Sequence, residues 1–90
     1  MVAAAAIPNK RSALGNRVMK AGKDYFTDKT AFTTMEQLDE TKRVVKETGQ
    51  KFWVYFSERL HVEGAVFAGQ LIKDGTIGEV IQVTGFGPHR

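Results

Sequence analysis

Apolar residues in the first third of the chain fall into short runs separated by an amphipathic stretch. The first run, residues 2–7, closes at the turn signal Pro8–Asn9 and predicts a strand. Residues 10–22 predict a helix, and Gly22 stands where a helix C-terminal glycine belongs. Residues 25–27 are rich in strand-forming side chains and predict a second strand. The helical spacing rests on Ala13, Leu14, Val18 and Ala21.

The middle of the chain predicts a second helix and a buried strand. Thr33 followed by Glu36 fits a capping box, although Thr34 could cap the helix instead, and Gly49 marks the helix end. Residues 51–56 form an unbroken aromatic and aliphatic run, typical of a strand buried on both faces of a parallel sheet. Trp53 is therefore expected in the core. The apolar face of this second helix is expected to comprise Met35, Leu38, Val45 and Thr48.

The last third predicts one more helix, over about 59–73, and one more strand, over about 77–84. The order is then β-α-β-α-β-α-β, which predicts an α/β fold with a parallel sheet. Ligands of such sheets lie beyond the carboxyl ends of the strands, which indicates the segments 7–9, 28–30 and 57–59. The third helix is expected to bury Val62, Ala65, Val66, Gly69 and Ile72.

Composition narrows the class of protein. Apolar residues make up 42% and charged residues 26% of the 90 residues, which is ordinary for a globular domain. The absence of cysteine excludes disulfides and cysteine-ligated zinc, and is compatible with the cytoplasm. His61 and His89 lie far apart, so no metal site is expected. No apolar run approaches the roughly 20 residues of a membrane span. A chain that begins inside a buried strand is expected to be part of something longer.

The net charge of +3 is concentrated early in the chain. Such a bias can indicate a polyanionic partner, but a solvated helix face explains it more simply, and nucleic acid is an unfavoured partner. No glycine-rich phosphate motif occurs, and Gly85–Phe86–Gly87 is better explained as a turn. The basic residues among the first thirty are Lys10, Arg11, Arg17, Lys20, Lys23 and Lys29, against Asp24 and Asp28.

Five short motifs in order resemble the NAD(P)-dependent oxidoreductases of the glucose–fructose oxidoreductase, inositol dehydrogenase and rhizopine-catabolism family (Gfo/Idh/MocA). They are Ile7–Pro8–Asn9, Ala21–Gly22–Lys23, the strand 25–30 ending in Asp28–Lys29–Thr30, Ser57–Glu58–Arg59, and the passage 71–80. Each motif is weak alone, but five at the right spacing are fairly specific. The resemblance implies the second half of a Rossmann-type sheet that runs into the start of a second-domain strand.

The resemblance also implies roles for individual residues. Lys29 would lie near the nicotinamide of NAD or NADP and assist proton transfer, and His89 would approach the substrate. Thr30 replaces the usual proline, so the aim of the lysine is in question. Asp28 replaces the usual glutamate, which shortens the carboxylate arm, and Ser12 replaces a frequent histidine, which suggests a divergent branch. The implied cofactor-binding residues are Pro8, Asn9, Asp28, Lys29, Glu58 and Arg59.

Three functions follow as hypotheses. In the first, residues 1–75 are the C-terminal half of a dinucleotide-binding domain, residues 76–90 begin a substrate and dimerisation sheet, and the chain belongs to a sugar or polyol dehydrogenase but is inactive alone. In the second, the chain is a small basic α/β module that binds a nucleotide or nucleic acid. In the third, its exposed strand edges pair with a second copy or with the missing halves of the domain.

Overall fold

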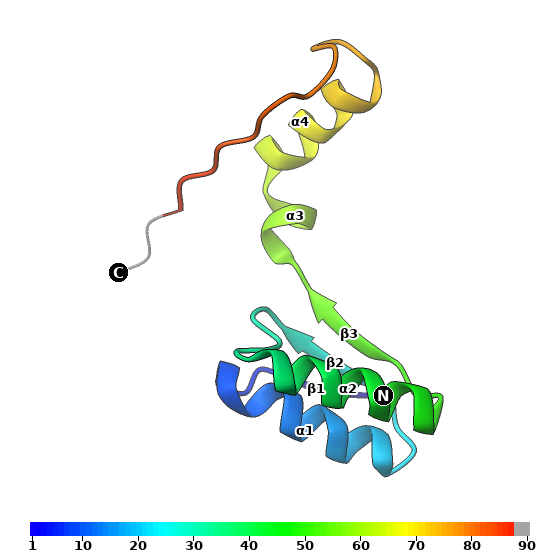
Figure 1. The fold of residues 1–90 in the computed structure, drawn as a ribbon. Coiled ribbons are helices and arrows are strands. Elements are labelled where there is room, and N and C mark those ends of the chain that lie inside the picture. The colour runs from blue at the N-terminus through cyan, green and yellow to red at the C-terminus, as the bar shows by residue number, and fades with distance from the viewer. Residues whose placement is uncertain (88–90) are drawn as a thin grey trace. The chain divides into compact units, whose positions relative to one another are not determined.

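The computed structural model describes residues 1–87 as three strands and four helices in mixed order (Figure 1). The chain divides into two units, residues 1–56 and residues 57–90, which are described separately. The predicted domain boundary after residue 75 stays a prediction. The elements are β1 (Val2–Ala4), α1 (Pro8–Lys20), β2 (Tyr25–Asp28), α2 (Met35–Thr48), β3 (Phe52–Tyr55), α3 (Ser57–His61) and α4 (Glu63–Lys73).

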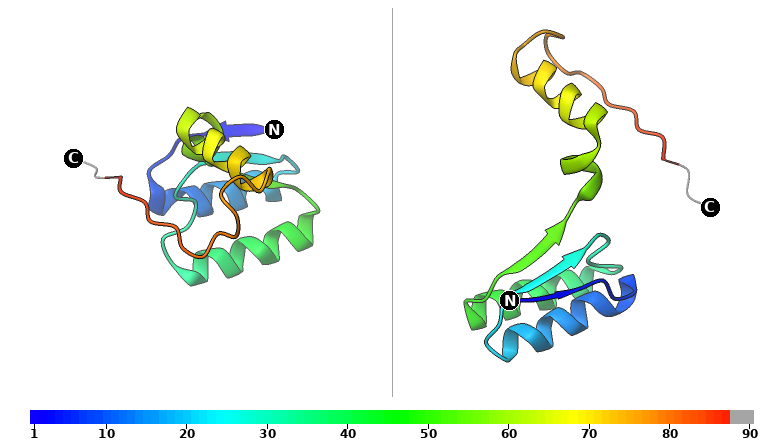
Figure 2. Two further views of the ribbon diagram at one scale, coloured as in Figure 1. Left: turned by 90° about the horizontal axis from the view of Figure 1, so that it is seen from above. Right: turned by 180° about the vertical axis from the view of Figure 1, so that it is seen from behind.

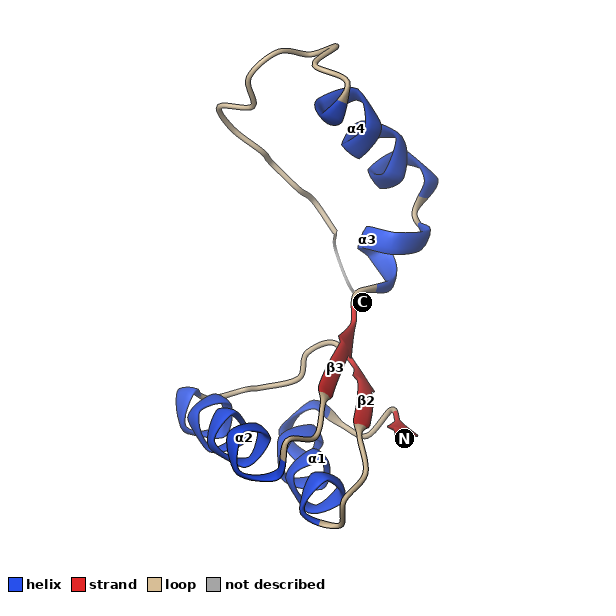
Figure 3. Cartoon of the chain, turned by 90° about the vertical axis from the view of Figure 1, so that its right-hand side faces the viewer, coloured by secondary structure: helices blue, strands red, loops and turns tan. Residues whose placement is uncertain are grey.

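The first unit is a parallel sheet of order β1-β2-β3 with both helices on one face. Tyr25 pairs with Val2 on one side and with Phe52 on the other. Figure 2, from behind, and Figure 3, by element type, show α1 and α2 along the same side of the strands. Two successive β-α-β crossovers of the same hand give this layering. The predicted α/β fold with a parallel sheet is confirmed.

The core lies between this face of the sheet and the two helices. Met19, Tyr25 and Val44 are completely buried, one each from α1, β2 and α2. Gly15 of α1 faces the rings of Tyr25 and Phe52 at a distance that leaves no room for a Cβ atom. The missing side chain therefore allows the helix to lie directly on two aromatic rings. The half-buried residues around this centre are Ala4, Leu14, Val18, Val45 and Phe52.

Helix α1 turns a different face to the core from the one its apolar spacing predicts. Ala13 and Ala21 are exposed, and Leu14 and Val18 are only half-buried. The Ser12 hydroxyl lies 3.0 Å from that of Thr41 on α2, so a polar pair is satisfied between the helices. The face that packs against α2 and the sheet therefore carries small and polar side chains as well as Met19. The buried residues of α1 are Arg11, Ser12, Gly15, Asn16 and Met19.

The start of α2 uses Thr34, the second of the two predicted caps. Its hydroxyl accepts a hydrogen bond from the Gln37 N–H at 3.3 Å, and the Gln37 side chain accepts one from the Thr33 N–H at 2.9 Å. The backbone N–H of Glu36 and the Thr34 hydroxyl hold the pKa of the Glu36 carboxyl below its ordinary value. Gln37 thus stands at the position predicted for Glu36, three residues after the cap, but its side chain bonds the N–H of the residue before the cap. Gly49 ends the helix in the left-handed region, with φ of 68°.

Trp53 was predicted in the core, and this is wrong. Its side chain is 51% exposed, with the Lys51 ammonium 5.9 Å from its ring centroid. Phe52 faces the helices, so Trp53 faces the opposite side of the sheet, because successive side chains of a strand alternate. Within residues 1–56 both helices lie on the other face, so β3 is covered on one side only.

The second unit corrects two further predictions for residues 57–87. The third helix is two helices that part at Val62, and no described segment after β3 is a strand, so the strand predicted over 77–84 is not formed. Ile81 and Val83 are strongly exposed. A strand needs a neighbour for its N–H and C=O groups, and residues 77–84 pair with none of the described strands.

The apolar side chains of α4 are also exposed, contrary to the predicted burial. Val62, Val66 and Ile72 are each between 44% and 51% exposed, and Phe67 is 65% exposed. Within this unit the five-residue α3 is the only other described helix, so no second layer covers them. None of the described helices is long and apolar enough to cross a membrane.

A buried hydroxyl in the core gives a test of the packing. Among the described residues, the Tyr25 hydroxyl has no hydrogen-bond partner, although the side chain is completely buried. Tyr25→Phe removes an unsatisfied polar group and keeps the ring, so we expect the free energy of unfolding to rise by about 1 kcal/mol. Urea denaturation followed by circular dichroism measures this. Tyr55→Phe, at a half-exposed position of β3, is the matched control, and a loss of stability in Tyr25→Phe would contradict the packing described.

Candidate functional site

Two of the three predicted segments lie at the carboxyl edge of the sheet in the first unit. Strand β1 ends at Ala4 and α1 begins at Pro8, while β2 ends at Asp28. Pro8 occupies the first helical turn, where its missing N–H costs nothing, and Ile7 precedes it in an extended conformation. Pro8 and Asn9 are both exposed. The turn therefore presents two accessible residues at the edge where α/β sheets bind ligands.

Lys29 follows β2 directly and lies at the wall of a pocket of about 330 Å³. The pocket is apolar apart from the lysine and Thr30, and it opens between the carboxyl ends of β2 and β3. An amine beside an apolar surface can transfer a proton to a bound molecule with little competition from water. The lining residues are Lys29, Thr30, Ala31, Phe32, Val54 and Phe56.

Asp28 has a structural hydrogen bond of its own. Its Oδ1 accepts from the backbone N–H of Lys29 at 2.8 Å, and its side chain is half-buried. In the sheet Asp28 pairs with Tyr55. The carboxylate therefore holds the backbone on which the lysine is carried. Its predicted contact with a cofactor stays a prediction.

Arg11 is a site residue that the sequence interpretation missed. The side chain is only 7% exposed. Its Nε donates to the Ala6 carbonyl at 2.6 Å. Its Nη1 donates to the carbonyls of Asp28 at 3.2 Å and Thr30 at 3.1 Å, and also to the carbonyl of Lys29. One buried cation thus ties the end of β1 to the segment that carries Lys29.

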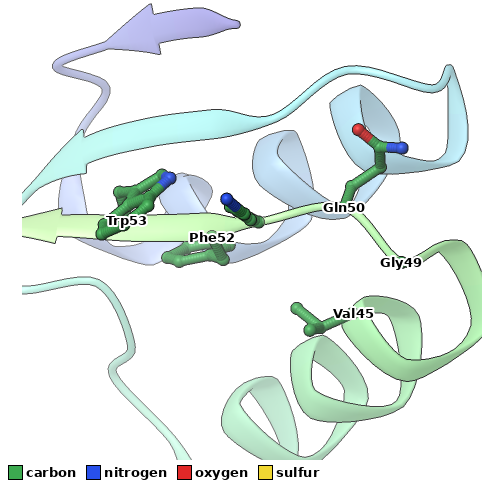
Figure 4. A pocket seen from close by; sticks show the side chains of 6 residues that line it. Val45, Gly49, Gln50, Phe52 and Trp53 are labelled. Carbon is green, nitrogen blue, oxygen red and sulfur yellow. The ribbon is translucent and has the colours of Figure 1, made fainter.

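A larger groove lies at the opposite edge of the sheet. It has a volume of about 460 Å³ and is bounded by Val45, Phe52 and Trp53, together with the turn 49–51 between α2 and β3 (Figure 4). Because β3 begins at Phe52, this is the amino end of the strand. Ligands of open parallel sheets bind at the carboxyl ends of the strands. The pocket beside Lys29 is therefore the better candidate for the ligand site, although its volume is smaller.

The remaining predicted residues lie in the second unit or beyond the described chain. Glu58 accepts a hydrogen bond from the Ser57 hydroxyl at 2.9 Å within α3, and Arg59 is exposed on the same helix. His89 lies outside the described residues, so its role stays a prediction. Among residues 1–87 no group of three or more histidine and acidic side chains could hold a metal ion.

Comparisons with known proteins identify what this arrangement resembles. The chain is 30% identical over 81 residues to a D-xylose dehydrogenase of Paenarthrobacter nicotinovorans, and covers 21% of that protein. It is 54% identical to a protein from Erwinia carotovora atroseptica assigned as an oxidoreductase, whose crystal structure it matches over 88% of its length with a TM-score of 0.81. The myo-inositol 2-dehydrogenase of Lactobacillus plantarum shares the fold, with a TM-score of 0.77 at 24% identity. No family model matches the chain.

These relatives are oxidoreductases, and the chain shares their α/β fold with a Rossmann-type parallel sheet. Within that class the chain is of the Gfo/Idh/MocA type, as the motifs predicted. The chain spans between a fifth and a quarter of the length of the relatives it matches. Dehydrogenases of this type use NAD(P) in general.

Proposed function

We propose that this chain is the part of an NAD(P)-dependent sugar or polyol dehydrogenase that carries the acid–base lysine, Lys29. The observation that carries the proposal is the position of Lys29, directly after β2 and at the wall of an apolar pocket at the carboxyl edge of the sheet. The D-xylose and myo-inositol dehydrogenases among the relatives support the substrate class. Residues 1–75 would form the second half of the cofactor domain, and residues 76–90 would begin the substrate and dimerisation domain.

The residues of this chain fit the nicotinamide end of such a cofactor. An apolar pocket with a single amine suits the flat nicotinamide ring and the reacting carbon, whereas the pyrophosphate needs a glycine-rich turn that this sequence does not contain. Pro8, Asn9 and Asp28 of the first unit would border the cofactor. The cofactor-binding roles predicted for Glu58 and Arg59 of α3 stay predictions. When bound, NAD(P) supplies the acceptor or donor of a hydride.

The chemistry assigned to this chain is proton transfer. As the substrate carbon loses hydride, its hydroxyl loses a proton, and the Lys29 amine accepts that proton. In the reverse direction the Lys29 ammonium returns the proton to the carbonyl oxygen. Asp28 contributes by fixing the lysine backbone through its carboxylate. His89 would contact the substrate.

The chain alone is expected to have no dehydrogenase activity. Hydride transfer requires cofactor and substrate to be held in a near-attack geometry, and 90 residues without a phosphate-binding turn supply only part of that. Absorbance at 340 nm should stay at background when the purified chain is mixed with NAD or NADP and a panel of sugars and polyols. Turnover that rises with chain concentration and survives a second purification would contradict this expectation.

A chimera tests the function directly. The matched 81 residues of this chain would replace their counterparts in the D-xylose dehydrogenase of Paenarthrobacter nicotinovorans. We expect the chimera to oxidise D-xylose with NAD(P), because the rest of that enzyme supplies the phosphate site and the substrate domain. A chimera that melts cooperatively and binds cofactor but does not turn over would refute the proposal. A smaller graft of residues 25–34 alone provides a second route if the larger one does not fold.

The two alternative functions have less support. The polyanion-binding module depends on a basic surface, yet Arg11 is buried and its donors are used by backbone carbonyls. Pairing with a second copy or with the missing halves of the domain remains a proposal, supported by β1 and β3, which are edge strands in the sheet of the first unit. Sedimentation that shows a strict monomer at all concentrations would remove self-association.

A further inference from the structure

The side chain of Arg11 combines burial with an unusual set of partners. Arg11 is the fourth residue of α1, and its exposed fraction is 7%. Its described hydrogen bonds all end on main-chain carbonyl oxygens, and none of them on a carboxylate. A buried cation requires compensation, and here the compensation comes from carbonyl dipoles. Arg11 is therefore a fixed part of the fold rather than a surface charge.

The partners of Arg11 are grouped along the chain. One carbonyl belongs to Ala6, in the turn between β1 and α1. The other three belong to the consecutive residues Asp28, Lys29 and Thr30, which include a cis Lys29–Thr30 peptide bond. The planar guanidinium fixes the directions of its N–H groups, and the described bonds use the one N–H of Nε and the two of Nη1, so several acceptors are held at fixed relative positions. A lysine ammonium could not reproduce that arrangement.

The same three residues carry the candidate acid or base. Lys29 is the middle residue of the three whose carbonyls Arg11 binds. Its backbone N–H also donates to the Asp28 carboxylate. Backbone order at this point limits where the Lys29 amine can lie. A misplacement of about 1 Å can lower a catalytic rate by about 100-fold.

We propose that Arg11 is a positioning residue, whose carbonyl contacts fix the 28–30 backbone and so aim Lys29 into the pocket beside β3. The role assigned to Lys29 rests on the proposed function, whereas the contacts of Arg11 and the order of the 28–30 backbone do not. Asp28 and Arg11 act as a pair: one binds the N–H and the other the C=O of the same residue.

Backbone dynamics of the 90-residue chain test the first half of the proposal. The variants are Arg11→Lys and Arg11→Met, with Arg17→Met as the matched control, because Arg17 is exposed on the same helix. We expect the ¹⁵N order parameters of residues 29–31 to fall from about 0.85 to below about 0.6 in both Arg11 variants. Residues 21–24, a turn that Arg11 does not contact, and the whole of Arg17→Met should keep their values.

The Arg11→Lys variant and the order parameters of residues 21–24 distinguish a local loss of order at residues 29–31 from general unfolding. If Arg11→Met does not fold, Arg11→Lys decides, since it keeps the positive charge and most of the length of the side chain. Order parameters at 29–31 that stay unchanged, or that fall no more than those at 21–24, would overturn the proposal.

The D-xylose dehydrogenase chimera tests the second half. Arg11→Lys should lower kcat by about 10- to 100-fold and change KM for D-xylose by less than about threefold, because the reacting group is misplaced while substrate binding is retained. Unchanged kcat in a chimera whose 28–30 backbone has lost order would overturn the positioning role. If Lys29→Met retains activity, the proposed function fails, and the order parameters still decide whether Arg11 fixes this backbone.

Discussion

Replacing Lys29 by methionine in the D-xylose dehydrogenase chimera is expected to lower kcat by about 10²- to 10⁴-fold, the range that general acid–base catalysis contributes. Methionine keeps the length and the apolar stem that borders the pocket, and removes only the group that carries the proton. The effect should lie in kcat, because the amine acts on the reacting oxygen in the transition state. Initial rates at saturating D-xylose, followed at 340 nm, measure it.

Two further variants separate acid–base chemistry from charge and from general damage. Lys29→Arg keeps a positive charge but cannot be deprotonated in a protein, so it should be nearly as inactive as Lys29→Met. Lys23→Met removes an exposed lysine from the turn before β2 and should retain full activity. An Arg variant with near-normal turnover would refute proton transfer by Lys29 and leave an electrostatic role in its place.

The sheet and the edge that bears the candidate site could be predicted from the sequence. Residues 2–7 and 51–56 each contain one strand, and residues 25–27 fall one residue short of β2, because short apolar runs between helical patterns are a strong signal. The carboxyl-edge rule then indicated the position of Lys29 without any glycine-rich motif. The family resemblance added the role of the lysine, which periodicity could not supply.

Arg11 could not be predicted, because the apolar periodicity of α1 favours the wrong face. Leu14 and Val18 suggest a buried stripe, while the face that packs most deeply carries Ser12, Gly15 and Asn16. The signal available was a second helical period at positions 11, 12, 15, 16 and 19, in which the small or polar residues 11, 12, 15 and 16 precede the apolar Met19. Burial of Arg11 and Ser12 is interpretable only when Thr41 and the backbone carbonyls that satisfy their polar groups are known.

Trp53 and the strand predicted over 77–84 show a second limit. An apolar run indicates that a segment packs against other parts of the protein, but it does not indicate which helix or strand packs against it. Trp53 lies on the face of the sheet opposite α1 and α2, and residues 77–84 pair with none of the described strands. Among the described residues, nothing covers the exposed face of β3 within residues 1–56 and no strand pairs with residues 77–84.

Gly15→Val is expected to lower the free energy of unfolding by about 3 kcal/mol, because overpacking costs typically 1–3 kcal/mol and the added branch restricts the side chain further. A Cβ at this position would lie 2.5 Å from Cε2 of Phe52 and 2.6 Å from Cδ1 of Tyr25. The half-buried Phe52 ring can move away from the new side chain, but the completely buried Tyr25 ring cannot. The clash with Tyr25 is therefore expected to make the substitution destabilising. Urea denaturation measures the change. Ala13→Val, exposed on the same helix, is the control and should cost less than about 1 kcal/mol. Equal losses in the two variants would mean that helix propensity, and not contact with the rings, limits this position.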